Sequence, residues 1–271
     1  MHPMRTRTLF ALLALAAPCA THAQARAAGA DAWTIPATRA PAPIPAREHA
    51  ARRARMLDSM GSGVLVLFGS DEPAGDRTPF VQNTPFRYLT GLMEPGARLV
   101  IDNRGAAPRE LLFVRPRDPA LEVWDGARLG TEGARALTGI AARPVSAMNA
   151  TVDSMLTAGT TLFTVLDIHP SGRVAEYPAR EHRFAERMAE AHPGIRVAPV
   201  NQLLMEIRAT KSALELDHLR RAIYITVLAQ REALRAVEPG HNEFEIQALI
   251  EGTFRRNGAD GPSFGTIVAS G

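Results

Sequence analysis

The sequence predicts two domains: an α/β domain with a mixed β-sheet over residues 47–204, and the beginning of an α+β domain over residues 205–271. Three observations predict this division. In the first segment, short apolar runs typical of strands alternate with helical patterns, as in α/β folds. Two of these runs are joined by a short turn containing Gly105 and Pro108, which favours an antiparallel hairpin and therefore a mixed sheet. In the second segment, two amphipathic helices precede a single strand, which are too few elements to close a core.

The elements of the first domain follow from apolar runs and the residues that interrupt them. A helix is predicted from Arg47 to Met60, because Gly61 supplies a favourable C-cap, and its arginines are expected on a solvated face. The uninterrupted apolar run Val64–Phe68 predicts a buried strand. The other expected strands lie at residues 98–102, 110–114, 161–166 and 195–200, and the other expected helices at residues 131–137 and 180–191.

The second segment opens on a capping-box pattern, Ser212-Ala213-Leu214-Glu215, followed by apolar residues at helical spacing. Pro239-Gly240 ends this helix, and a second helix begins at Asn242 in the same way. The apolar run after Pro262 predicts a buried strand that continues to residue 271. The faces expected to need covering comprise Leu216, Leu219, Ile223, Val227, Leu234 and Val237 on the first helix and Phe244, Leu249, Ile250 and Phe254 on the second.

Residues 1–25 are predicted to be a secretory signal peptide. A basic start is followed by an apolar stretch at residues 9–17, which is too short to span a bilayer. Small residues at Ala23 and Ala25 suit cleavage after either position. The mature protein is therefore expected to be secreted or periplasmic, with an Ala/Pro-rich lead-in over residues 26–46. A membrane anchor is the alternative interpretation of the N-terminus.

Composition narrows the classes of partner. The formal net charge is +3, and it falls to about +1 without the signal peptide, so no nucleic-acid partner is expected. Cys19 is the one cysteine of the sequence, and its removal with the signal peptide would leave no disulfide and no thiol chemistry. A lipoprotein anchored at Cys19 is the alternative.

Candidate ligands for a metal share one predicted helix face: His182, Glu186 and Glu190. Flanking arginines favour surface ion pairing of these residues instead. His218 lies on the exposed side of its helix, where a lone histidine is usually solvated. Gly61-Ser62-Gly63 precedes a strand and predicts a turn, not a phosphate-binding loop. The sequence contains no His-Glu-x-x-His, Gly-x-Ser-x-Gly or Walker-type motif.

Trp124 is the centre of an unusual local cluster with Glu122 and Arg128. A tryptophan buries a large apolar area and needs one partner for its N–H group, so packing within the first domain is the favoured interpretation. The alternative is that Trp124 anchors a contact between subunits.

Four blocks, in order and at matching spacing, resemble aminopeptidases P, the Xaa-Pro aminopeptidases of the pita-bread metallopeptidase family. The second block contains Arg-Asp-Pro…Glu-x-Trp-x-Gly-x-Arg-x-Gly, which is more similar to aminopeptidase P than to its prolidase or creatinase relatives. The last block reads Phe-Gly-Thr-Ile-Val-Ala-Ser-Gly, similar to the stretch that opens the family's active-site region. The blocks are Phe80–Ala97, Pro116–Gly130, Ile207–Leu216 and Phe264–Gly271.

The resemblance implies a fold of the creatinase/aminopeptidase P N-terminal type followed by the truncated start of a pita-bread domain. It implies a metal site of two Asp, one His and two Glu that usually holds a manganese pair, two divalent ions in all. Those ligands lie downstream of the last block, so no catalytic, cofactor-binding or metal-ligating residue is assigned to this chain. In family oligomers an aromatic side chain can sit at the position of Arg87, close to a neighbouring active site, and Arg87 departs from that pattern.

Three functions remain open at this point. The first is the front part of an exported Xaa-Pro aminopeptidase that acts on proline-containing peptides, forms a homo-oligomer and is inactive as the chain stands. The second is a non-catalytic module for peptide binding or oligomerisation. The third is a related hydrolase, either a prolidase-like dipeptidase or a creatinase-type amidinohydrolase. No nucleic acid is expected as a partner, and no membrane after signal cleavage.

Overall fold

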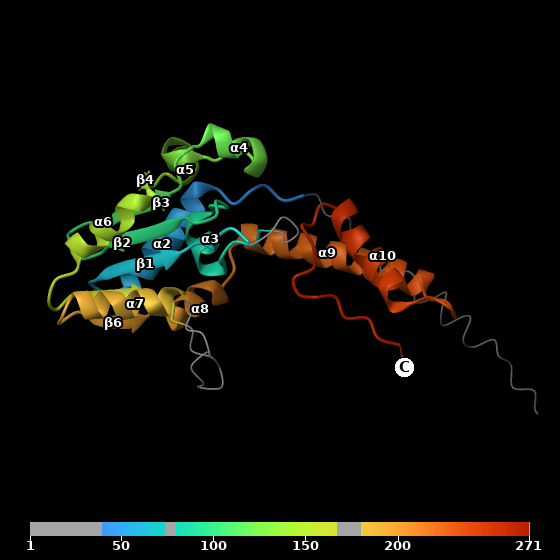
Figure 1. The fold of residues 1–271 in the computed structure, drawn as a ribbon. Helices are drawn as coiled ribbons and strands as arrows, with labels where there is room; N and C mark the ends of the chain where they lie inside the picture. The colour runs from blue at the N-terminus through green and yellow to red at the C-terminus, as the bar shows by residue number, and fades with distance from the viewer. Residues whose placement is uncertain (1–39, 74–79, 167–179, 271) are drawn as a thin grey trace, which may run out of the picture. The chain divides into compact units, whose positions relative to one another are not determined.

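The computed structural model describes residues 40–73, 80–166 and 180–270 (Figure 1). Internal contacts divide the described chain into two units, Pro41–Asp217 and the residues from His218 onward. The predicted signal peptide, most of the lead-in and Cys19 lie outside the described residues. None of the described helices is both long enough and apolar enough to cross a membrane.

The first unit is built on a six-stranded sheet in the order β4-β3-β2-β1-β5-β6. β1 pairs antiparallel with β2, and β2 with β3, whereas the pairs β3–β4, β1–β5 and β5–β6 are parallel. The predicted mixed sheet and its hairpin are therefore confirmed. The strands are β1 (Val64–Phe68), β2 (Arg98–Asp102), β3 (Arg109–Val114), β4 (Ala141–Pro144), β5 (Thr161–Thr164) and β6 (Arg196–Pro199).

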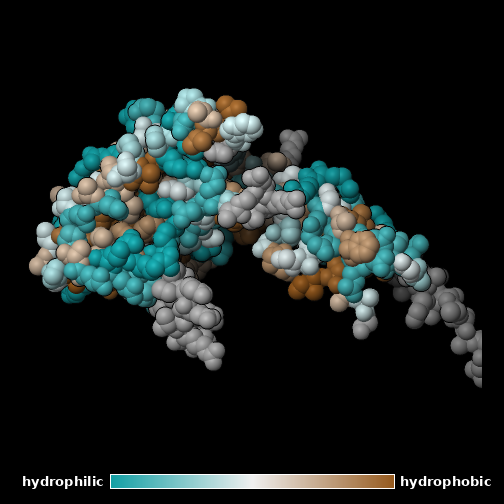
Figure 2. Space-filling model, viewed as in Figure 1, coloured by the Kyte–Doolittle hydropathy of each residue, from teal (hydrophilic) through white to brown (hydrophobic). Residues whose placement is uncertain are grey.

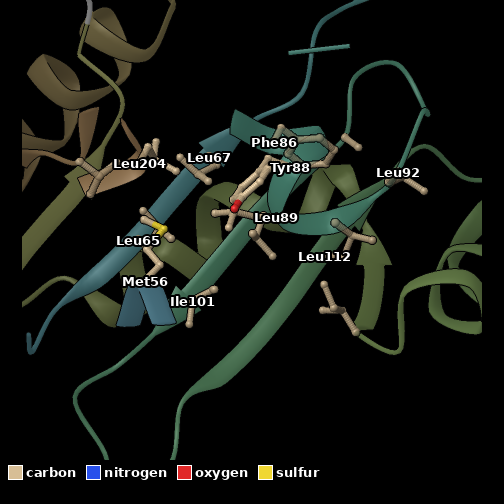
Figure 3. Close-up of a cluster of buried hydrophobic side chains, with 14 of the residues drawn as sticks. Met56, Leu65, Leu67, Phe86, Tyr88, Leu89, Leu92, Ile101, Leu112 and Leu204 are labelled. Atoms are coloured by element: carbon tan, nitrogen blue, oxygen red, sulfur yellow. The ribbon is translucent and has the colours of Figure 1, made fainter. Parts of the chain in front are cut away.

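Helices cover both faces of the sheet, which explains why β1 is apolar at every position. Leu65 and Leu67 point into a core formed with α2 (Ala46–Met60), α3 (Thr84–Thr90), α5 (Gly130–Thr138) and α8 (Asn201–Ala209), part of which is drawn in Figure 3. The alternate residues Val64, Val66 and Phe68 point into a second core with α6 (Met148–Met155) and α7 (Arg180–Ala191). All five residues of β1 are buried.

The prediction that the arginines of α2 lie on a solvated face is wrong for Arg52 and Arg53, which are buried. Arg47 and Arg55 are exposed, as predicted. Arg53 is 3 % exposed and grips Glu110 of β3 through two hydrogen bonds of 2.9 Å. Arg52 is 2 % exposed. A buried guanidinium requires carboxylate and carbonyl partners, which here come from elements distant in the sequence. Periodicity along α2 alone could not reveal those partners.

Several short elements were not predicted from the sequence: α3, α4 (Pro119–Asp125), β4, the 3₁₀ turn η2 (Val145–Ala147), α6 and α8. Two of the short helices are fixed by their N-caps. The side chain of Asn83 accepts a hydrogen bond from Phe86 N, and that of Asp118 accepts from Ala120 N and Leu121 N. A proline at the start of each helix supplies a suitable backbone angle. Capping, rather than an amphipathic period, carries the sequence signal for such helices.

The second unit contains most of α9 (Ala213–Ala236) and all of α10 (Glu243–Arg256). Both predicted capping boxes are formed: Glu215 accepts from Ser212 N at 2.8 Å, and Glu245 accepts from Asn242 N at 2.7 Å. The unit has a small core in which alanines let the two helices approach, made of Ala229, Ala233, Ile246 and Ile250.

The predicted buried strand after Pro262 is wrong. Residues 264–270 form no strand, and Phe264 and Ile267 are 73 % and 83 % exposed. A strand is stable only when its backbone groups pair with a neighbour. In the described part of the chain no strand is hydrogen-bonded to this segment.

Candidate functional site

The segment that resembles the opening of the family's active-site region lies along α10 as an extended tail, residues 264–270. The Thr266 hydroxyl donates to Glu251 Oε1 at 2.7 Å, and Ser270 N donates to Glu243 Oε1 at 2.7 Å. These two glutamates from one helix therefore hold the tail at two points.

A cavity of about 310 Å³ opens between the tail and the two helices of the second unit. Its walls are mostly apolar, from Ile225 of α9, Ile250 and Phe254 of α10, and Phe264 and Ile267 of the tail. Figure 2 shows exposed hydrophobic residues on this part of the chain. The cavity offers apolar contact area, with few polar groups to direct a substrate.

Glu251 is the acid that holds Thr266 of the tail. Hydrogen bonds from Gln247 and from Thr266 favour the ionised form and lower the pKa of the Glu251 carboxyl below its ordinary value. An ionised, hydrogen-bonded carboxylate is suited to fixing the tail. A general acid would need the opposite shift.

The candidate metal ligands on α7 do not form a centre. His182 Nε2 and Glu186 Oε1 are 3.8 Å apart, with side chains 39 % and 58 % exposed, as in a surface ion pair. Throughout the described ranges, no group of three or more His, Cys, Asp or Glu side chains is placed to hold a metal ion. No reaction step through a metal is therefore derived from these residues.

The packing interpretation of Trp124 is wrong, because its side chain is 86 % exposed. Trp124 lies near the end of α4, a helix that the sequence pattern does not predict. Val123 beside it is 76 % exposed. Arg117 Nε donates to Glu122 Oε1 at 3.1 Å, and Arg117 Nη2 donates to Glu122 Oε2 at 2.5 Å. This bidentate pair stabilises the first turn of the helix. The geometry thus presents an aromatic side chain to solvent on a capped, braced helix.

The block at residues 86–88 alternates between core and surface. Phe86 is fully buried, Arg87 is exposed and Tyr88 is 9 % exposed.

Gly63 has a packing role, since a Cβ there would lie 2.5 Å from Thr161 O. Gly63 therefore allows close approach of β5, whereas a Cβ at Gly61 would meet nothing within 4 Å.

Sequence interpretation missed a buried polar cluster where α8 meets α9. Arg52 Nη2 lies 3.4 Å from Glu215 Oε1, and the Tyr88 hydroxyl donates to Ile207 O at 3.1 Å. The pattern around Glu215 indicated a helix cap, which is correct but incomplete. Pairing across such sequence distances leaves no signal in periodicity or spacing.

Two family models match the chain in the same order as the two units. The model "Aminopeptidase P, N-terminal domain" matches residues 49–163, and "Metallopeptidase family M24" matches residues 217–271. The chain is 32 % identical over 235 residues to the Xaa-Pro aminopeptidase of Haemophilus influenzae, and 31 % identical over 241 residues to that of Escherichia coli K12. These alignments cover 85 % and 84 % of this chain but 52 % and 53 % of the relatives, so the chain spans about half their length.

Solved structures agree with the sequence matches. The low-pH form of aminopeptidase P from E. coli superposes with a TM-score of 0.71 at 27 % identity, covering 83 % of this chain and 53 % of that one. Aminopeptidase PepP from Pseudomonas aeruginosa gives 0.71 at 28 % identity, covering 83 % and 52 %. Other E. coli aminopeptidase P structures are described as a complex with the inhibitor Pro-Leu and as a zinc-substituted complex with product.

The fold and the family matches together define a chain in which a mixed α/β domain is followed by the start of a metallopeptidase domain. The chain belongs to the aminopeptidase P family: it carries the N-terminal domain and the start of the M24 domain. It is homologous to Xaa-Pro aminopeptidases.

Proposed function

We propose that this chain is the N-terminal portion of an exported Xaa-Pro aminopeptidase, which releases the first residue from peptides with proline at position two. The observation that carries the proposal is the ordered match of both family models along one chain, at residues 49–163 and 217–271. A prolyl amide has no N–H group and restricts its neighbour, so its hydrolysis calls for a dedicated site.

The metal chemistry of the proposed enzyme belongs to residues beyond those described. A bound divalent metal would activate a water for attack on the peptide carbonyl. We expect two ions, manganese by family resemblance. The described residues contribute instead the folded N-terminal unit and the tail that α10 holds.

The chain as it stands is proposed to be inactive, which can be tested directly. Residues 26–271 would be purified and assayed on a Xaa-Pro peptide with added manganese, beside E. coli aminopeptidase P as the positive control. We expect no turnover above the uncatalysed background. Turnover comparable to the control would show that the described residues suffice and would overturn the assignment of the ligands to a later segment.

Export is proposed from the N-terminal pattern of residues 1–25. Mass spectrometry of the protein expressed with its complete N-terminus is expected to find a mature chain starting at Gln24 or Arg26. An intact Met1 on protein recovered from the cytoplasm would refute export while leaving the peptidase assignment untouched.

An oligomerisation role is the second candidate, and one observation favours it. Trp124 and Val123 are exposed on α4, and tryptophan is enriched among residues that anchor interfaces. Sedimentation of the wild type and of Trp124→Ala tests the interface itself, since loss of an oligomer in the variant supports an interface at α4. A prolidase-like or creatinase-type activity has no comparable support, because the relatives described above are Xaa-Pro aminopeptidases.

A further inference from the structure

We propose that Arg52 and Tyr88 are positioning residues. They clamp the α8–α9 junction, residues 207–215, onto α2 and α3 of the first unit. The junction immediately precedes residues 217–271, the stretch matched by the metallopeptidase model. The clamp would thereby fix where α9 begins. Its purpose rests on the proposed function, but its contacts lie within the unit Pro41–Asp217 and can be tested without any activity.

Tyr88 holds the end of α8. Its side chain belongs to the core shown in Figure 3, and its hydroxyl donates to Ile207 O at 3.1 Å. Burial, and next the charge of Glu215, raise the pKa of the Tyr88 hydroxyl, which therefore stays protonated and able to donate. The guanidinium of Arg208, the next residue of α8, lies 5.8 Å from the centre of the same ring.

Arg52 connects that ring to the start of α9. Its guanidinium lies 4.2 Å over the centre of the Tyr88 ring, and Nη1 donates to Tyr88 O at 3.1 Å. Nη2 lies 3.5 Å from Glu48 Oε1 and 3.4 Å from Glu215 Oε1. A guanidinium that is 2 % exposed depends on such anions, because an uncompensated buried charge is strongly unfavourable.

Glu215 serves two neighbours with its two oxygens. Oε2 accepts from Ser212 N at 2.8 Å and so caps α9, while Oε1 faces Arg52. A glutamine could still cap the helix through its carbonyl oxygen, but it could not neutralise Arg52. The two roles are therefore separable by mutation.

These contacts meet at both ends of the turn between the two helices. Tyr88 fixes a carbonyl in the last turn of α8, Arg52 faces a carboxylate in the first turn of α9, and the two side chains stack on each other. A disturbance at one end should therefore be felt at the other. That coupling distinguishes a clamp from two unrelated stabilising contacts.

Hydrogen exchange measured by mass spectrometry on the whole chain tests the coupling. Tyr88→Phe removes the hydroxyl that donates to Ile207 O of α8 and that also meets the side chain of Arg55 on α2, and Glu215→Gln removes a charge from α9 while retaining the cap. We expect each variant to accelerate exchange about fivefold to tenfold at residues 207–209 and also at residues 216–219, with β1 changed less than about twofold.

The control is Tyr224→Phe, the same chemical change on the body of α9, which is expected to leave both reporter segments unchanged. Acceleration confined to residues 207–209 in Tyr88→Phe, or no acceleration, would overturn the clamp. Ser212→Ala removes the other half of the capping box, in which Ser212 Oγ accepts from Glu215 N at 3.3 Å, and leaves the charge of Glu215 in place. If it reproduced the Glu215→Gln effect at both segments, capping would explain the data and the charge on Glu215 would have no positioning role. A full-length protein that does not cleave Xaa-Pro peptides would overturn the proposed function and leave the clamp untouched.

Discussion

The buried charged and polar side chains of α2 show how strongly single residues depend on partners from other elements. His49 is 6 % exposed, and its Nδ1 lies 2.9 Å from Tyr88 O, a geometry that calls for a proton on Nδ1. Burial lowers the pKa of His49 and outweighs the hydrogen bond to the Tyr88 carbonyl, which raises it; the charges of Arg52 and Arg53 lower the pKa further, and Glu48 raises it. The native state therefore favours the neutral ring.

His49 should make the N-terminal unit sensitive to mild acid. The pKa of His49 is lower in the folded than in the unfolded chain, so the unfolded chain binds a proton first as the pH falls. Its contribution is intact above about pH 6.5 and is lost as the pH falls toward the folded pKa. We expect His49→Asn, whose amide can still donate to Tyr88 O, to show a shallower fall in Tm between pH 7 and pH 5.

The matched control is His182→Asn, since His182 lies on the outer face of α7 with a side chain 39 % exposed. The control should follow the wild-type pH dependence. Equal slopes for wild type and His49→Asn, measured by thermal unfolding at several pH values, would contradict the assignment of the acid sensitivity to His49.

Gly63 is a second residue whose identity the packing dictates. A Cβ at this position would lie 2.5 Å from Thr161 O and 2.6 Å from the ring of Phe163, where β1 and β5 meet. We expect Gly63→Ala to lower the free energy of unfolding by about 1–3 kcal/mol, because the strands must separate to admit the methyl group. Gly105→Ala, whose Cβ would meet Ala107 O at 3.6 Å, is the control and should change stability by less than about 0.5 kcal/mol in urea unfolding.

At the scale of elements, the positions of helices and strands can be predicted from the sequence far better than the burial of their side chains can. The helix predicted at residues 180–191 forms with the same bounds, and the strand predicted at Val64–Phe68 does too. Capping boxes at Ser212 and Asn242 predicted helix starts correctly because their partners lie three residues away. Local chemistry suffices for such features.

Elements were mispredicted where the outcome depends on distant neighbours. Residue type favours the core for Trp124, yet α4 leaves it exposed, and the run after Pro262 lacks a partner strand among the described residues. Residue type likewise favours solvent for Arg52 and Arg53, yet both are buried against partners from other elements. A candidate site could not be predicted in detail because its contacts, such as Arg52 with Glu215, join residues far apart in the chain.

Because Trp124 on α4 is exposed, we expect its truncation to affect assembly of the protein more than the stability of the monomer. Trp124→Ala should leave the Tm of the dilute protein within about 1–2 °C of the wild type, because a side chain 86 % exposed contributes little burial. Phe86→Ala, at a fully buried position, is the contrasting variant and should cost about 3–5 kcal/mol. Thermal unfolding at high dilution checks both. A sharp loss of stability in Trp124→Ala would show that α4 packs its tryptophan inside.

At the scale of the whole molecule, the two units differ in how completely they bury their apolar side chains. The first unit sandwiches its sheet between two cores, and α8 belongs to one of them through Leu204. The second unit leaves Leu234, Phe244 and Ile267 at 78 %, 68 % and 83 % exposure. Among the described residues of this unit, the core cluster comprises four buried residues. Apolar burial is the main favourable term in folding, so the units should differ in autonomy.

Residues 41–217 should therefore fold alone, whereas residues 213–271 should not. The first fragment keeps the sheet, both cores and the Arg52–Glu215 contact, so we expect one cooperative urea transition with a midpoint close to that of the longer chain. The second fragment retains α9 and α10, whose shared core is small and whose Leu234 and Phe244 are exposed, so its helical signal should melt without a sigmoidal transition. A cooperative transition in residues 213–271 would mean that the contacts between α9, α10 and the tail form a sufficient core. A fragment 41–217 that fails to fold would instead show that the first unit depends on residues from His218 onward.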